Sequence, residues 1–127
     1  ENPLLATPLT SADFLSSSHV AVTIGPGRQL TYAERHLQSL PKARTVEILA
    51  PSFSVVPWLI IGTKRLTVMH ERLARVFAEN LPLNIQPLPL DVPPMREMLQ
   101  YHEARTHDAG IIWLRQLLHE TAAGMTI

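Results

Sequence analysis

The stretch RTVEILAPSFSVVPWLIIGTKRLTVMHERLARVFAEN, residues 44–80, decides the fold. Its apolar pattern predicts a strand, an apolar helix that ends at Gly62, a short second strand and an amphipathic helix. This order is typical of a parallel βαβα unit, because parallel strands need a long crossover between them. Open sheets of this kind bind ligands where strands end and helices begin. The stretch therefore predicts both a fold class and the edge at which a site should lie.

Elements of the same two kinds surround this stretch. In chain order the sequence predicts an extended start (1–9), a helix (10–16), a strand (19–24), a turn (25–27), a helix (31–40) and strands at 45–49, 66–69 and 83–88. Residues 95–102 have helical spacing of apolar side chains, and a clear last helix begins at an Asp108 cap and ends at Gly124. We therefore expect an α/β fold of three layers, αβα, with a mainly parallel sheet and right-handed crossovers.

The apolar helix at the centre of the chain contains a proline. With Ser54 as N-cap, Pro57 falls in the first turn, where its missing N–H leaves no hydrogen bond unmade. The helix is then expected to run to Ile61 and, being apolar nearly all round, to be buried on more than one side. Trp58 and Trp113 both lie in apolar helices, and we expect both in the core.

Length and charge place the chain among ordinary globular domains. It has 127 residues, a 46% hydrophobic fraction, and equal numbers of acidic and basic side chains, 11 of each. A balanced charge gives this segment no basic surface for nucleic acid or anionic membranes, and no stretch approaches a membrane span. The lack of cysteine excludes disulfides and fits a reducing compartment. We expect a cytoplasmic protein. The start at Glu1, without Met, is interpreted as a cut inside a longer protein.

The familiar catalytic and metal motifs do not occur. His102 and His107 are five residues apart and do not share a helix face, whereas a zinc-binding pair needs a spacing of four. No nucleophile elbow is present, and Ser16-Ser17-Ser18 is more simply a turn. Gly25-Pro26-Gly27-Arg28 lacks the lysine of a phosphate loop, although it lies at a strand end. We expect no catalytic residue, no metal and no cofactor.

Residues 51–54, Pro-Ser-Phe-Ser, are the best candidate for a binding site. They join a strand to a helix N-terminus, where free N–H groups favour an anion such as a carboxylate. Phe53 is placed to cover an aromatic or apolar ligand. The alternative is structural, with Ser52 or Ser54 capping the helix and Phe53 in the core.

Several segments together resemble the effector-sensing domain of LysR-type transcriptional regulators. They are LLATPLTSADFL (4–15) and the region 44–75 with GTKRLTVMHERLAR. The tail, LPLNIQPLPLDVP (81–93), LQYHEAR (99–105) and DAGIIWLR (108–115), is similar to the subgroup of rhizobial nodulation-gene regulators. The resemblance covers nearly the whole chain, and its specificity lies in the order and spacing of these segments.

The resemblance implies one lobe of a fold like the type II periplasmic binding proteins. Residues 1–94 correspond to the second regulatory lobe, and residues 95–127 to a return segment and C-terminal helix that belong to the first lobe. The resemblance also implies that residues 95–102 are mainly a strand. This conflicts with the helical spacing of their apolar side chains, and we favour the strand. A winged helix-turn-helix for DNA binding belongs to the N-terminal part of such proteins.

The resemblance also implies where a small effector, aromatic or carboxylate-bearing, would bind between the lobes. The residues carried over are Thr23, Ile24, Gly25, Pro51, Ser52, Phe53, Thr67 and Val68. Without the first lobe, the apolar face of the last helix would be exposed, so we expect a homodimer, an exchanged tail or a helix folded back.

Two other functions are compatible with the sequence. One is a lobe of an extracytoplasmic solute-binding protein, which predicts a secretion signal upstream in the gene. The other is a small α/β enzyme, which predicts a nucleophile with a partnered base. A regulator predicts a DNA-binding domain upstream instead, and would contact DNA only through that domain.

Overall fold

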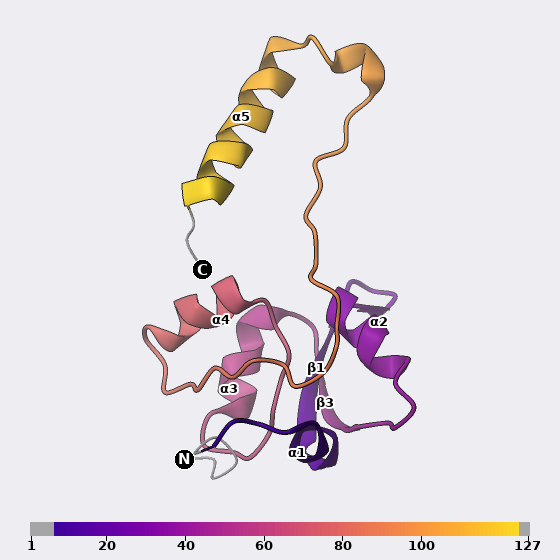
Figure 1. Cartoon of the computed structure of the whole chain (residues 1–127), viewed down its shortest axis with the longest axis vertical. Helices are drawn as coiled ribbons and strands as arrows, with labels where there is room; N and C mark the ends of the chain where they lie inside the picture. The colour runs from indigo at the N-terminus through magenta and orange to yellow at the C-terminus, as the bar shows by residue number, and fades with distance from the viewer. Residues whose placement is uncertain (1–6, 125–127) are drawn as a thin grey trace. The chain divides into compact units, whose positions relative to one another are not determined.

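The computed structural model describes residues 7–124, and the expected extended start therefore lies mostly outside the described residues. The chain divides into two compact units, Glu1–Pro93 and Pro94–Ile127, which we call the main unit and the tail unit (Figure 1). Among the described residues, no helix combines the length and the apolar composition that crossing a bilayer requires.

The main unit is built on a three-stranded sheet of order β2-β1-β3. Its strands are β1 (Ser18–Ile24), β2 (Gln29–Leu30) and β3 (Thr45–Ala50). β3 is parallel to β1, whereas β2 is antiparallel to it. The α/β class is thus confirmed, but the expectation of a mainly parallel sheet is wrong. The reason is the tight turn after β1, which lets the chain double back as a short hairpin partner.

Two predicted strands lack the partners that would make them strands. The segment 66–69 contributes one parallel bridge, from Leu66 to His19, in which the Val20 amide donates to the Leu66 carbonyl over 2.9 Å. Residues 83–88 form no regular element. Prolines at 82, 87 and 89 remove backbone donors there, so a ladder of strand hydrogen bonds cannot continue.

Hydrophobic clusters cover both faces of β1. Successive strand residues point to opposite faces, so Val20 and Val22 face one way and His19 the other. The first cluster, which we call the α3 cluster, consists of Val20, Val22, Ala50 and Val56. The second, the α1–α2 cluster, consists of Phe14, Leu37 and Leu66. Helices therefore lie on both sides of the sheet (Figure 1).

Hydroxyl caps start the two helices that precede β3. α1 (Ser11–Ser16) begins at Thr10, whose hydroxyl accepts from the Asp13 amide over 3.1 Å. α2 (Tyr32–Gln38) begins at Thr31, whose hydroxyl accepts from the Glu34 amide over 3.3 Å. Both starts match the sequence prediction, because capping is a local interaction. α2 ends at Gln38, two residues before the predicted end.

The central helix differs from its prediction at its start and in its burial. A 3-10 turn, η2 (Phe53–Val55), leads into α3 (Val56–Ile60), and Ser54 is inside the turn and is not the N-cap. Pro57 does lie in the first turn of α3, and Gly62 follows with a φ of 72°. Burial is one-sided: Val56 is buried, whereas Trp58 is 69% exposed. The expected core position of Trp58 is therefore wrong, because α3 packs on one face of the sheet only.

α4 (Glu71–Ala78) completes the main unit and confirms the amphipathic helix that was predicted for the end of the stretch 44–80. Glu71 and Arg75 form an exposed ion pair one turn apart, with Arg75 Nη2 2.6 Å from Glu71 Oε1.

The tail unit contains the segment 94–102, a 3-10 turn η3 (Glu103–Arg105) and α5 (Ala109–Gly124). Residues 95–102 form neither the helix that their spacing predicts nor the strand that the resemblance implies. Asp108 caps α5 as predicted, with its Oδ1 accepting from the Ile111 amide over 3.1 Å. Trp113 is 64% exposed rather than in a core. The apolar residues Ile112, Leu117 and Leu118 are exposed as well.

Candidate ligand-binding site

Two surface hollows, each of about 530 Å³, lie toward opposite ends of the parallel pair β1 and β3. The C-terminal hollow is lined by Thr23, Gly25, Pro26, Arg28, Leu49 and Pro51. The N-terminal hollow is lined by Ser16, Ser17, Ser18, Glu47, Gly62, Thr63, Lys64 and Arg65. Their chemistry distinguishes them.

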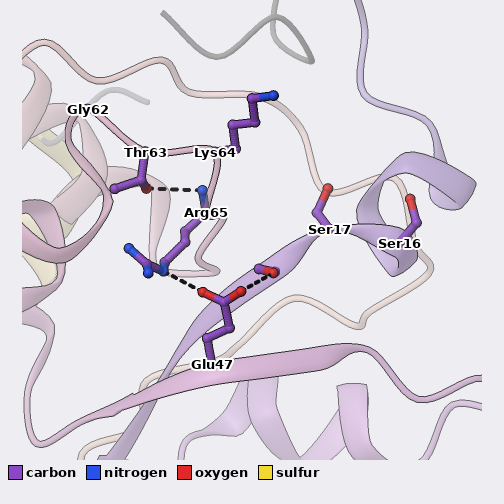
Figure 2. Close-up of a pocket in the computed structure, with 8 residues that line it drawn as sticks. Ser16, Ser17, Glu47, Gly62, Thr63, Lys64 and Arg65 are labelled. Carbon is purple, nitrogen blue, oxygen red and sulfur yellow. Dashed lines mark hydrogen bonds and ion pairs between the residues drawn. The ribbon is translucent and has the colours of Figure 1, made fainter.

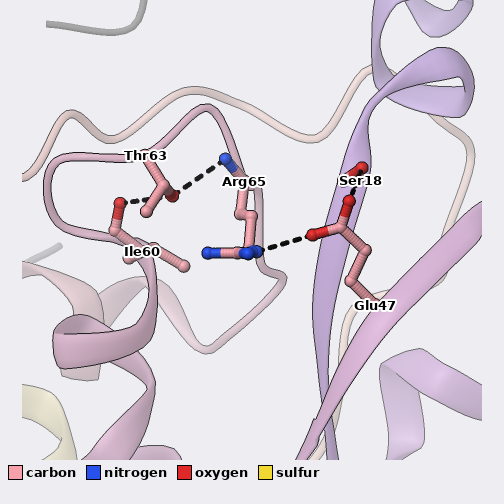
Figure 3. A network of polar contacts seen from close by, with 5 residues as sticks. All are labelled: Ser18, Glu47, Ile60, Thr63 and Arg65. Carbon is pink, nitrogen blue, oxygen red and sulfur yellow. Dashed lines mark hydrogen bonds and ion pairs between the residues drawn. The ribbon is translucent and has the colours of Figure 1, made fainter.

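The polar groups of the N-terminal hollow are engaged with one another. Glu47 accepts from the Ser18 hydroxyl over 2.5 Å and from Arg65 Nε over 2.7 Å (Figure 3). These two hydrogen bonds, that of Ser18 first, hold the pKa of Glu47 below its usual range. In the pairing of β3 with β1, Val46 and Ile48 have partners and Glu47 has none. This local irregularity of the strand determines the direction of the Glu47 side chain. This network ties β1, β3 and the loop after α3 together.

The serines and Thr63 around the same hollow also have local partners. Ser16 and Ser17 hydroxyls donate to the Asp13 carbonyl over 3.2 and 2.7 Å, which closes the end of α1. Figure 2 shows both serines at the side of the hollow opposite Thr63 and Lys64. Thr63 Oγ1 donates to the Ile60 carbonyl over 2.8 Å and accepts from the Arg65 amide over 3.1 Å. The N-terminal hollow thus has the properties of a structural junction.

The C-terminal hollow lies where open α/β sheets bind ligands. The parallel register sets Val22 opposite Ala50, so the loop after β1 and the loop after β3 leave the sheet side by side. Three of the carried-over residues, Thr23, Gly25 and Pro51, line this one hollow. Gly25 has a φ of 74°, a conformation that glycine adopts without steric cost.

Ile24 and Phe53 lie on the other side of the sheet from Thr23. Strand alternation turns Ile24 away from Thr23, and its side chain is 52% exposed. Phe53 packs against the α3 cluster, with its ring centroid 6.2 Å from that of His70. Ser52 Oγ is 2.8 Å from Ser54 Oγ, and neither serine makes a capping hydrogen bond to α3. A ligand-binding role for Ile24, Ser52 and Phe53 stays a prediction.

Thr67 and Val68 do not line the C-terminal hollow. Val68 packs against the α1–α2 cluster. Thr67 Oγ1 is buried and has no hydrogen-bond partner within the described residues. Their expected proximity to an effector is likewise still a prediction.

Sequence reasoning missed three residues of the C-terminal hollow, namely Pro26, Arg28 and Leu49. Pro26 and Arg28 belong to the turn that directly follows a predicted strand. That position is the sequence signal by which they could have been identified as site residues. Leu49 could not have been selected, because its place depends on the register between β1 and β3.

The histidines discussed here, His19 and His102, make structural contacts, and no metal centre is formed within residues 7–124. In that range no group of three His, Asp or Glu side chains converges. His102 Nδ1 accepts from the Ala104 amide over 3.1 Å and so caps η3. His19 is fully buried against Phe14, with ring centroids 4.5 Å apart. Burial, and secondarily the charge of Arg44, lowers the pKa of His19 to about 4.

Comparison with known proteins relates the chain to nodulation proteins. It is 36% identical to nodulation protein D 2 of Rhizobium tropici over 98% of its own length, and 35% identical to nodulation protein D 2 of Bradyrhizobium diazoefficiens over 98%. It spans 40% and 38% of those relatives, about two fifths of their length. No family model and no solved structure matches the chain. The resemblance to nodulation-gene proteins is thus confirmed as homology across nearly the whole chain.

Proposed function

We propose that this chain is the effector-sensing part of a bacterial LysR-type transcriptional regulator. The observation that carries the proposal is the similarity to nodulation D proteins, at 32 to 36% identity over 98% or more of the chain. The chain contributes no catalytic step in this proposal.

The two units of the chain would belong to different lobes of the sensor. Residues 1–94 would form the second regulatory lobe, and residues 95–127 would return to the first lobe and supply its last helix. The exposed apolar side chains of α5 support this assignment, because an isolated helix with such a face needs a partner surface.

The effector would bind between the lobes at the C-terminal ends of β1 and β3. The C-terminal hollow supports this place, since it gathers Thr23, Gly25 and Pro51. An effector that binds the closed arrangement of the lobes more tightly would shift the population toward closure. That shift would reach promoter DNA through a winged helix-turn-helix in the N-terminal part of the protein. The protein would act in the cytoplasm, as a homodimer.

Sequencing the gene upstream of the Glu1 codon is the first test. We expect a region that encodes a DNA-binding domain of winged helix-turn-helix type. Binding of the complete gene product to its own promoter region should then respond to a small aromatic acid. A secretion signal upstream would overturn the proposal in favour of a solute-binding protein, and an upstream region without a DNA-binding domain would also overturn it.

A further inference from the structure

The C-terminal hollow combines apolar walls with one charged side chain. Leu49, Pro26 and Pro51 supply apolar surface, and Leu49 is 54% exposed beside the hollow. Thr23 adds a hydroxyl-bearing side chain, and Arg28 adds the charge. None of the lining residues carries a carboxylate. An anionic ligand would therefore meet a cation in this hollow and no opposing charge from its lining.

Arg28 holds a backbone conformation that an arginine rarely adopts. It closes the turn after β1 by donating its amide to the Gly25 carbonyl over 3.1 Å, and its φ is 49°. The left-handed region costs a residue with a Cβ about 1 to 2 kcal/mol, and such strain concentrates at functional sites. A glycine or asparagine would fit this position at lower cost. The presence of arginine here thus points to a use for its side chain.

The guanidinium of Arg28 has no ion pair or hydrogen bond to another side chain within residues 7–124. Arg65, which lines the other hollow, differs in this respect because Glu47 binds it. Arg28 is therefore available to an anion from solution. An arginine is well suited to that task, since its planar fork matches the two oxygens of a carboxylate.

We propose that Arg28 binds the carboxylate of a small aromatic acid in the C-terminal hollow, with the ring of the acid against Leu49 and the two prolines. This inference rests on the proposed function, and it adds the residue that selects the carboxylate of the ligand. Apolar walls with one oriented polar group are the usual composition of such sites.

The test uses the complete gene product with benzoate as the probe and benzamide as its neutral counterpart. Thermal unfolding and calorimetric titration should show binding of benzoate and at least tenfold weaker binding of benzamide. Arg28→Asn tolerates the left-handed backbone and removes the charge, so it should not lower the stability of the ligand-free protein and should weaken benzoate binding about tenfold or more. Arg28→Lys should bind benzoate with intermediate affinity, because it keeps the charge and loses the fork.

Arg35→Gln is the matched control, since Arg35 is an exposed arginine on α2 and does not line the hollow. It should bind benzoate like the parent protein. The proposal is overturned if the parent protein does not bind benzoate, or if Arg28→Asn binds it as tightly as the parent. A failure of this kind in a gene product that has a DNA-binding domain would reject the role of Arg28 and leave the regulator assignment in place. If the gene product lacked such a domain and Arg28→Asn still lost benzoate binding, the role of Arg28 would stand and the regulator assignment would be rejected.

Discussion

Glu34 on α2 and Arg44, the residue before β3, form an ion pair in the interior of the main unit, where each side chain is only 5% exposed. The Glu34 amide is held at the same time by the Thr31 hydroxyl, so the start of α2 fixes the carboxylate in place. Arg44 Nη1 is buried and has no hydrogen-bond partner within the described residues. The pair therefore couples α2 to the edge of the sheet.

Removal of one partner should be costly, because the other is left as an uncompensated buried charge. We expect Glu34→Gln and Arg44→Met each to lower the free energy of unfolding by about 3 to 5 kcal/mol. Replacing both together with apolar residues should cost less than the sum. Urea denaturation followed by circular dichroism measures each value.

The exposed pair of Glu71 and Arg75 supplies the control. Its side chains are 49% and 57% exposed, so Glu71→Gln should change the free energy of unfolding by about 0.5 kcal/mol at most. Equal costs for Glu34→Gln and Glu71→Gln would show that the buried pair does not have the strength inferred for it.

The pair also illustrates which features the sequence could predict. The cap at Asp108 was predicted correctly, because a cap is an interaction among neighbours in the chain. The link from Glu34 to Arg44, the antiparallel β2 and the place of Leu49 in the hollow depend on tertiary pairing. The same dependence explains the wrong strand predictions at 66–69 and 83–88, since a strand exists only with a partner.

His19 should make the main unit less stable in mild acid. Its folded-state pKa is about 4 and its unfolded value about 6.5, so the unfolded chain takes up the proton first as pH falls. Stability should be complete above pH 6.5 and decline toward pH 4, by on the order of 3 kcal/mol. Unfolding by urea at a series of pH values from 7 to 4.5 measures this decline.

His19→Leu should flatten the pH dependence in that window, because the titrating group is gone. Carboxylates such as Glu47, whose pKa is lowered from 4.5, lose their contribution only at still lower pH. His107→Gln changes an exposed histidine and should keep the parent profile. A decline that persists unchanged in His19→Leu would assign it to another group.

Phe53 should influence the effector response through the loop that begins at Pro51. Phe53→Leu retains an apolar side chain against the α3 cluster, so it should cost less than about 1.5 kcal/mol of stability. In the complete gene product we expect a weaker effector response, since the proposed function counts Phe53 among the residues near the effector. Phe77→Leu on α4 is the matched change at a phenylalanine that has no part in the proposal. An effector response that stays at the parent level in Phe53→Leu would remove Phe53 from the site.

The apolar side of α5 should make the 127-residue chain associate with itself. Trp113 and Leu117 are one helical turn apart and both exposed, which a soluble monomer avoids. We expect sedimentation velocity to show a dimer of the parent chain and a monomer of the double variant Trp113→Glu, Leu117→Glu. His119→Glu adds a charge on the polar side, near Arg115, and should remain dimeric. A parent chain that sediments as a monomer would show that the tail does not pair, and equal dissociation by His119→Glu would attribute the effect to charge alone.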